Sequence, residues 1–254
     1  MRNIKLVLAY DGTEYAGWQR QLGQPTIQQI VEEALARLTQ VPVVLHGAGR
    51  TDAGVHAEGM TANFQTESAI PLSGLVKGLN SMLPEAIRVL GAENVADDFH
   101  ARYNAKGKVY AYTFVATEIM PPCLRLYAAQ IRGPFAASAV RLCLPMLIGT
   151  HDFSSFEATG SRDLSIAGGR GAVRTIFAAE LVGEEGKDPA VYRLTIAGDG
   201  FLRHMVRNIV GTLFAVGRSR LTPNEFQGIV AARDRTLAGA TAPANGLTLK
   251  TVLY

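Results

Sequence analysis

The chain has 254 residues, of which 48% are hydrophobic and 19% charged, a composition that supports a packed core and excludes an intrinsically disordered chain. No apolar run reaches the ~18 residues that a membrane span needs, and the N-terminus lacks a signal-peptide cleavage site. Cys123 and Cys143 fit neither a disulfide framework nor a zinc pattern. We therefore expect a cytoplasmic protein with no membrane contact.

The net charge of +3 is unevenly distributed along the chain. Residues 1–98 carry 7 Lys and Arg against 11 Asp and Glu, whereas residues 99–254 carry 18 against 11. Arginine outnumbers lysine 19 to 6. This pattern is typical of a protein that binds a polyanion. A GC-rich genome, which favours arginine codons, explains the arginine excess equally well.

The first hundred residues predict the order strand, helix, strand, strand, helix, strand. The predicted strands cover residues 4–10, 41–46, 60–65 and 87–95, and the helices start at Thr26 and Pro71. Gln29 follows Thr26 by three residues, which predicts a capping box. The order β-α-β-β-α-β is that of a ferredoxin-like unit.

The second part of the chain repeats this order less regularly. Its predicted strands cover residues 108–116, 173–181, 191–197 and 246–253, and its helices 135–148, 202–216 and 223–232. Gly217 is placed to cap the second of these helices, and residues 166–172 are expected to form a flexible loop. We therefore predict an α+β fold of two ferredoxin-like halves with mainly antiparallel sheets. Their expected boundaries are 1–100 and 101–254.

A glycine-rich loop spans residues 47–56 and contains Arg50 and Asp52. Three glycines allow a tight backbone that approaches a ligand closely, and a carboxylate among small residues can act as nucleophile or base. An ordinary Asx-turn at Asp52 is the alternative interpretation. The loop lacks the GKS or GKT of a phosphate-binding loop and precedes a strand, which excludes the dinucleotide-binding motif.

Two basic segments are further candidates. Alternation places Lys108, Tyr110 and Tyr112 on one strand face, an arrangement that holds unstacked nucleotides in many proteins. Arg203 and Arg207 are spaced to share one helix face in a stretch without acids. A half-buried strand and a solvated helix face are the respective alternatives.

The histidines and the single tryptophan give little evidence for further functional sites. The five histidines form no metal-binding motif, so we expect no metal site. Trp18 is expected either to pack as a lid on the core or to help form an RNA-binding cleft.

Taken together, these segments resemble the TruA family of tRNA pseudouridine synthases. The resemblance covers nearly the whole chain. It rests on YDGTEYAGWQRQ, GAGRTDAGVHA, DDFHARY, KVYAY, GTHDFSSF, FLRHMVRNIVG and GLTLKTVLY, in the order of that family's motifs. The Lys-Val pair before Tyr110 replaces the more usual paired basic residues, and the stretch after Arg162 is longer than usual.

The resemblance implies isomerisation of uridine to pseudouridine at positions 38, 39 and 40 of tRNA, in the anticodon arm. It implies that Asp52 is the catalytic aspartate and that Arg50 helps to turn the target nucleotide out of the stem. Tyr110 would stack on the uracil and Arg207 would pair with Asp52. We further expect Lys108, Arg203 and His204 to contact RNA. No metal or redox cofactor is required, because the reaction is a neutral isomerisation.

The resemblance also implies a homodimer whose tRNA crosses both subunits, and a catalytic cleft between the two halves of the chain. Two rival hypotheses remain. A non-catalytic RNA-binding module would bind tRNA without turnover. A hydrolase with Asp52 as nucleophile would usually need a metal or a second acid nearby. The sequence leaves open whether Asp52 attacks the ribose C1′ or the base.

Overall fold

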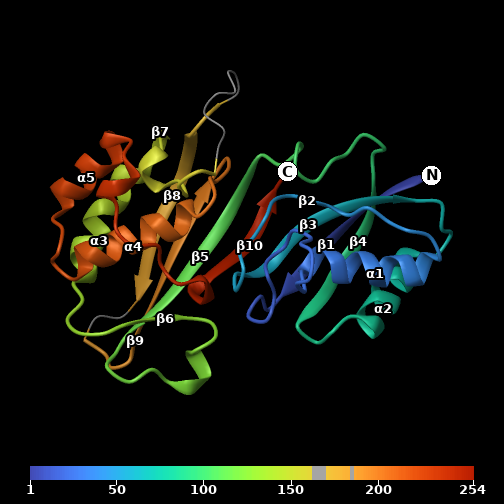
Figure 1. Cartoon of the computed structure of the whole chain (residues 1–254), viewed down its shortest axis with the longest axis horizontal. Helices are drawn as coiled ribbons and strands as arrows, with labels where there is room; N and C mark the ends of the chain where they lie inside the picture. The colour runs from blue at the N-terminus through green and yellow to red at the C-terminus, as the bar shows by residue number, and fades with distance from the viewer. Residues whose placement is uncertain (162–169, 184–185) are drawn as a thin grey trace. The chain divides into compact units, whose positions relative to one another are not determined.

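The computed structural model describes residues 1–161, 170–183 and 186–254 (Figure 1). The chain divides into two compact units. The N-terminal unit comprises residues 1–108 and 248–254, and the central unit comprises residues 109–247. Both units are mixed α/β with mostly antiparallel strand pairing. No helix of the described residues is long and apolar enough to cross a membrane.

The sheet of the N-terminal unit has the strand order β4-β1-β3-β10, and β2 pairs with β3. Its strands are β1 (Arg2–Tyr10), β2 (His46–Gly47), β3 (His56–Thr66), β4 (Ile87–Val95) and β10 (Leu247–Leu253). β1 pairs antiparallel with both β3 and β4, and β2 with β3, whereas β10 runs parallel to β3. Ile4, Leu6 and Leu8 alternate into the core, as their period of two predicts.

Helices α1 (Ile27–Thr39) and α2 (Leu72–Met82) lie side by side against this sheet (Figure 1). The predicted capping box is wrong. Thr26 makes no side-chain cap hydrogen bond and its hydroxyl is buried without a partner in the described chain. Gln29 instead donates to Glu33 Oε1 at 2.8 Å, one helical turn further on.

The predicted strand over 41–46 is also largely wrong, because regular pairing begins only at His46. Val41 and Val44 are 50% and 62% exposed, so these β-branched residues do not face a core. By contrast, the strand predicted over 87–95 coincides with β4.

The central unit has the strand order β5-β9-β8-β7, and β6 pairs in parallel with β5. Its strands are β5 (Gly107–Ala116), β6 (Ala129–Ile131), β7 (Gly149–Asp152), β8 (Val173–Gly183) and β9 (Ala190–Gly198). Its helices are α3 (Ala137–Cys143), α4 (Met205–Gly217) and α5 (Pro223–Ala232). Short 3₁₀ turns are η1 (Pro122–Leu124), η2 (Leu144–Leu147), η3 (Ser154–Phe156), η4 (Arg235–Leu237) and η5 (Ala244–Gly246).

Two helices of the central unit differ from their predicted bounds. α3 ends at Cys143, where Pro145 in the next turn favours the 3₁₀ form. α4 begins at Met205 rather than at residue 202, because His204 has left-handed backbone with φ 61°. At the other end, Gly217 is the last helical residue, and the positive φ falls on Ser219. Most of the loop predicted over 166–172 lies outside the described residues.

Candidate active site

The glycine-rich loop between β2 and β3 is folded as a tight turn. Val55 N donates to Asp52 O at 3.1 Å, and Gly54 between them has φ 75°. This left-handed backbone costs a glycine no strain, which explains the residue type at that position. Asp52 is half-buried at the start of the turn, whereas Arg50 is exposed.

The segment after β1 holds this loop from one side. Trp18 N donates to Thr51 O at 3.1 Å, and the hydroxyls of Tyr10 and Thr51 lie 2.8 Å apart. A Cβ on Gly17 would lie 2.5 Å from Thr51 O, so only glycine allows this approach. Trp18 is 2% exposed and packs on Gly47, which identifies it as a core residue. Both the main-chain carbonyl and the hydroxyl of Thr51 are thus held, and they fix the loop at this residue.

The side chain of Lys108 lies against the glycine-rich loop. A Cβ added to Gly49 would lie 2.5 Å from Lys108 Nζ, so the ammonium group rests against the backbone of the loop. The N-terminal unit therefore brings three of the predicted site residues together: Arg50, Asp52 and Lys108. One carboxylate and two cations thus lie on or beside the loop, and the two cations would attract an anionic ligand.

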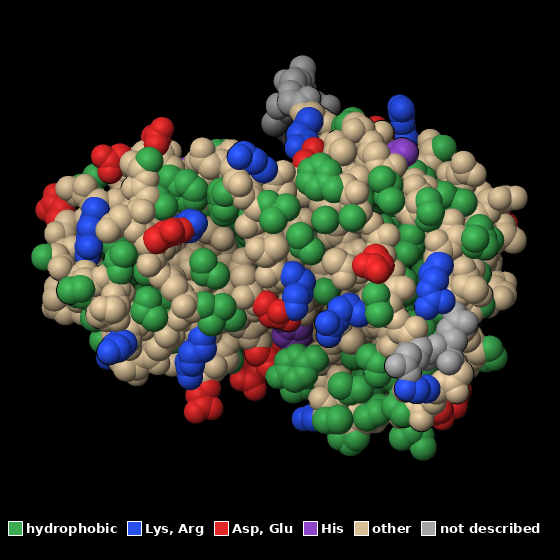
Figure 2. All heavy atoms as spheres, turned by 180° about the vertical axis from the view of Figure 1, so that it is seen from behind, with side chains coloured by type: hydrophobic (Ala, Val, Ile, Leu, Met, Phe, Trp, Pro, Cys, Tyr) green, Lys and Arg blue, Asp and Glu red, His purple; other side chains and the backbone are tan. Residues whose placement is uncertain are grey.

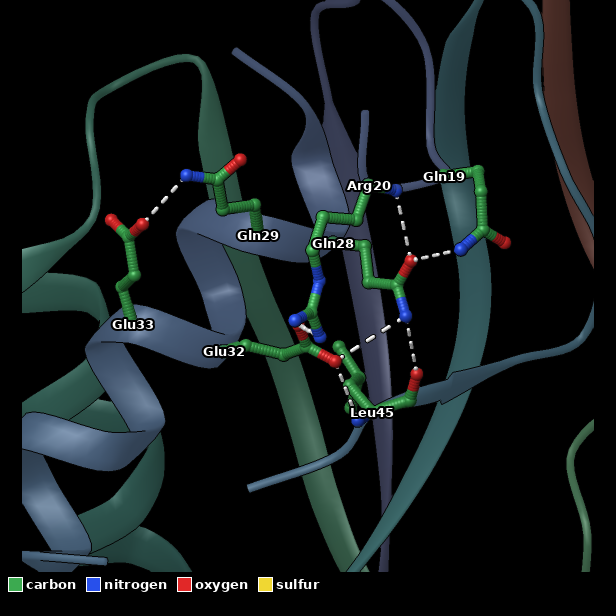
Figure 3. Close-up of polar contacts among 7 residues, drawn as sticks. All are labelled: Gln19, Arg20, Gln28, Gln29, Glu32, Glu33 and Leu45. Atoms are coloured by element: carbon green, nitrogen blue, oxygen red, sulfur yellow. Dashed lines mark hydrogen bonds and ion pairs between the residues drawn. The ribbon is translucent and has the colours of Figure 1, made fainter. Parts of the chain in front are cut away.

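A buried polar network supports the strand that leads into the loop (Figure 3). Glu32 is 6% exposed, pairs with Arg20 and accepts from Leu45 N at 2.9 Å. Gln28 Nε2 donates to Leu45 O at 3.0 Å. Both backbone polar groups of Leu45 are thereby fixed by α1, although the chain is not yet paired as a strand there. Sequence reasoning missed this network, because Gln28 and Glu32 read as surface residues of a helix.

In the central unit, Tyr110 and Tyr112 lie on β5 as predicted, but their surroundings differ. Tyr110 is 8% exposed and makes an edge contact with Phe201 at 5.1 Å between ring centroids. Tyr112 is fully buried, packs on Phe214, and donates to Pro243 O at 2.8 Å. Burial raises the pKa of its hydroxyl, which the nearby Arg207 partly opposes. Tyr112 is therefore a core residue, and the predicted open aromatic face does not extend to it.

Arg207 lies in the first turn of α4 and is anchored to the segment 238–242. Its Nε donates to Ala242 O at 2.8 Å, and Ala242 N donates to Arg207 O at 3.0 Å. A Cβ on Gly211 would lie 1.7 Å from Ala240 O, so the segment runs directly over the helix backbone. These contacts fix the position of Arg207 from both its main chain and its side chain.

Asn208 fixes the same segment from the buried side of α4. Its Nδ2 donates to Phe156 O at 2.8 Å, while its Oδ1 accepts from Thr241 Oγ1 at 2.7 Å and from Arg235 Nη2 at 3.1 Å. Arg235 also donates to the carbonyl of Gly239. The segment 238–242 is therefore held by a partly buried polar network around the buried Asn208. Sequence reasoning missed Asn208; an asparagine among the apolar residues of a helix was its only signal.

Arg203 and His204 precede α4, so the predicted common helix face of Arg203 and Arg207 is wrong. The left-handed His204 turns the chain before the first helical residue. Both Arg203 and His204 line a pocket of about 510 Å³ together with Thr159 and Arg235. This pocket is a candidate RNA contact of the central unit.

The central unit thus contains four predicted site residues, namely Tyr110, Arg203, His204 and Arg207. On the face drawn in Figure 2, Lys and Arg side chains are scattered among hydrophobic, polar and acidic side chains. Among the described residues, no group of three or more His, Cys, Asp or Glu could hold a metal ion.

Comparison with known proteins places these residues in a family. A sequence model of the tRNA pseudouridine synthase family matches residues 6–104 and 144–254. The chain is 49% identical to tRNA pseudouridine synthase A 1 of Desulfotalea psychrophila, and the match covers all of both chains. It is 43% identical to tRNA pseudouridine synthase A of Geobacter sulfurreducens and 42% identical to that of Clostridium acetobutylicum, again over the full length of both. The chain belongs to the tRNA pseudouridine synthase family, which is a family of isomerases.

Proposed function

We propose that this member of the family isomerises uridine to pseudouridine at positions 38, 39 and 40, in the anticodon arm of tRNA, with Asp52 as the catalytic carboxylate. The observation that carries the proposal is the position of Asp52: a half-buried carboxylate opens a fixed glycine turn, in a chain that matches its relatives along its whole length. Catalysis requires that the reacting group be held in a fixed position, which the turn provides for Asp52.

The reaction breaks the bond between ribose C1′ and uracil N1 and forms a bond between C1′ and C5. A proton leaves C5, and N1 gains one, so the product is a neutral isomer. The Asp52 carboxylate can take part in two ways: it can bond covalently to the substrate, or it can accept the C5 proton. The first way has two forms, attack on C1′ and attack on the base, and the proposal holds for each.

Three further residues have proposed roles around the target nucleotide. Arg50 is exposed at the loop and would help to turn the uridine out of the stem, which costs a few kcal/mol of lost stacking. Tyr110, whose ring is held by Phe201, would stack on the uracil. Arg207, anchored on Ala242, would pair with Asp52 and hold its carboxylate in position. Lys108, Arg203 and His204 would bind the RNA backbone.

We also propose that residues 1–100 and 101–254 form two ferredoxin-like halves. In the N-terminal unit the order β4-β1-β3 with β2 beside β3 is the order expected of this fold, and β5-β9-β8 in the central unit follows the same scheme for three strands. The resemblance to the TruA family further supports a cytoplasmic homodimer. Sedimentation should then give twice the chain mass; a monomeric mass at working concentration would contradict the dimer.

The direct test is incubation of the protein with unmodified tRNA, followed by mapping of pseudouridine at single-nucleotide resolution. We expect conversion at positions 38 to 40 by the wild-type chain. Asp52→Asn keeps the shape of the side chain but removes its capacity to attack or to accept a proton, so we expect no product while tRNA still binds. Glu58→Gln is the matched control, because Glu58 is an exposed carboxylate on β3.

Three outcomes would contradict the proposal. Binding of tRNA without conversion by the wild-type chain would favour a non-catalytic RNA-binding module. Wild-type rates for Asp52→Asn would remove Asp52 from the chemistry. Release of free uracil instead of pseudouridine would indicate a hydrolase.

A further inference from the structure

A second basic pocket lies at the other end of α4 from Arg207. It has a volume of about 630 Å³ and is lined by Arg132 after β6, by Phe135 before α3, and by Arg218 and Arg220 after α4. Arg132 and Arg220 are exposed, and Arg218 is half-buried. The family resemblance assigned no role to any of these residues.

The three arginines bring positive charge to the pocket without a compensating acid. In the described part of the chain, none of their guanidinium groups forms an ion pair or a hydrogen bond. Glu118 lies next to this segment, but its carboxylate accepts from Gly133 N at 2.8 Å and, among the described residues, forms no ion pair with the three arginines. Three uncompensated cations around one concavity repel each other unless an anion joins them.

Arg218 gives a second, independent indication that the pocket binds an anion. Its Nε is buried and has no acceptor among the described residues. A buried donor without a partner costs about 1–3 kcal/mol, and more when it is charged. A ligand oxygen in the pocket would remove this cost, and a guanidinium binds phosphate in two-pronged geometry.

The pocket is part of a rigid frame. Ala136 N donates to Gly217 O at 2.7 Å, which ties the segment before α3 to the end of α4. A Cβ on Gly217 would lie 2.2 Å from Phe135 Cε2, and Phe135 packs with Phe114 at 5.2 Å between ring centroids. The backbones that carry the arginines are therefore fixed before a ligand arrives, which lowers the entropy cost of binding.

The helix end alone does not explain the three cations. A helix C-terminus attracts positive charge, but its last carbonyls already accept backbone hydrogen bonds: Phe214 O from Arg218 N, and Ala215 O from Arg220 N. No arginine side chain of the pocket donates to them in the described structure. Arg132, moreover, comes from a different part of the chain.

We infer that this arginine pocket, formed by Arg132, Arg218 and Arg220, binds phosphate groups of the RNA backbone of the substrate tRNA. The inference rests on the proposed function for the identity of the RNA. Arg218 follows Arg207 by eleven residues, which corresponds to about 16 Å along the helix axis. The pocket therefore binds phosphates away from the target nucleotide, and it contributes to affinity rather than to the chemistry.

The test is the salt dependence of tRNA binding by the double variant Arg132→Gln/Arg220→Gln, which leaves the end of α4 and Arg218 intact. Each neutralised phosphate contributes about 0.7 to 0.9 to the slope of log K against log salt. We expect the slope of the variant to be shallower by about 0.7 to 1.8, according to whether one or two phosphates are lost. Fluorescence anisotropy with unmodified tRNA measures it.

Two control variants separate a specific site from general charge. Arg37→Gln/Arg193→Gln removes the same charge from exposed positions on α1 and β9 and should keep the wild-type slope. Arg132→Lys/Arg220→Lys keeps the charge and should keep most of the slope. If the glutamine variant had lost slope through a folding defect, the lysine variant would lose it equally. An equal loss in the first control, or an equal loss in the glutamine and lysine variants, would overturn the inference.

A small anion is the remaining alternative occupant. Inorganic phosphate is titrated against the wild-type protein at constant ionic strength. Saturable phosphate binding that the glutamine variant loses, together with an unchanged tRNA slope, would identify a small-anion site and overturn the inference. Conversion of uridine in the same tRNA is measured separately with the wild-type chain, so a failure of the proposed function is recognised independently of the slopes.

Discussion

Replacement of Gly211 by alanine should displace Arg207 without altering any chemical group of the proposed site. The new Cβ would lie 1.7 Å from Ala240 O, whereas ordinary contact begins at 3.4 Å. The carbonyl must therefore move by about 1.7 Å, and a misplacement of about 1 Å can cost a factor of roughly 100 in rate. We expect pseudouridine formation at saturating enzyme to fall by about two orders of magnitude.

The effect on stability follows from two opposing terms. Alanine is more favourable than glycine in a helix by about 1 kcal/mol. The loss of three hydrogen bonds opposes this gain. Two of them join Arg207 and Ala242, and the third joins Gly239 N to Thr212 Oγ1. Each contributes about 0.5–1.5 kcal/mol, so we expect a net loss of about 0.5–3.5 kcal/mol in the free energy of unfolding.

Gly228 provides the matched control, because it is an exposed glycine of α5 and a Cβ there would meet no atom within 4 Å. Gly228→Ala should stabilise the protein by up to about 1 kcal/mol and leave activity unchanged. Single-turnover assays and urea denaturation measure both quantities. If Gly211→Ala resembles Gly228→Ala in rate and stability, the segment 238–242 does not position Arg207 and the reasoning is refuted.

Three further expectations concern single side chains. Tyr110→Phe should keep most turnover and Tyr110→Leu lose it, since stacking contributes about 1–3 kcal/mol; equal loss in both would give the hydroxyl a chemical role. Arg207→Ala should reduce single-turnover rates severely, and adding Asp52→Asn should cost little more, because residues that act as a unit are non-additive. Additive losses would separate the two. Glu32→Ala leaves Leu45 N–H without its acceptor and should cost about 1–3 kcal/mol in urea denaturation, whereas Glu32→Gln keeps an acceptor and should cost less than about 1 kcal/mol; equal costs would contradict the network.

Elements with one regularly buried face were predictable from the sequence. β1, predicted over residues 4–10, buries alternate residues from Ile4 onward. The start of α4 was not predictable, because Leu202 is buried and extends the helical spacing although it lies outside the helix. Residue spacing reports which side chains are buried, and it carries no sign of the left-handed backbone at His204.

The candidate site shows the same limit. The loop with Asp52 was evident from its glycines, and each basic segment from its lack of acids. The support of the site was not evident, because the segment 238–242 has no periodicity and Asn208 acts through buried hydrogen bonds. Besides Asn208, Gly211 in mid-helix was a local signal, since a glycine inside a helical pattern often marks a close approach.

Close contacts at glycines therefore position the segments that carry the proposed catalytic groups. A Cβ on Gly12 would lie 2.1 Å from Val55 O, and one on Gly47 would lie 2.5 Å from the ring of Trp18, so both sit where a neighbour touches the Asp52 loop. Gly211 has the same relation to the segment that anchors Arg207. In each case a glycine, which has no reactive side chain, determines where a proposed catalytic group lies, because the close contact leaves no room for a Cβ. Substitutions at these positions should thus reduce the rate of reaction more than they reduce tRNA binding, since they displace groups that act on the target nucleotide and leave the basic contacts in place.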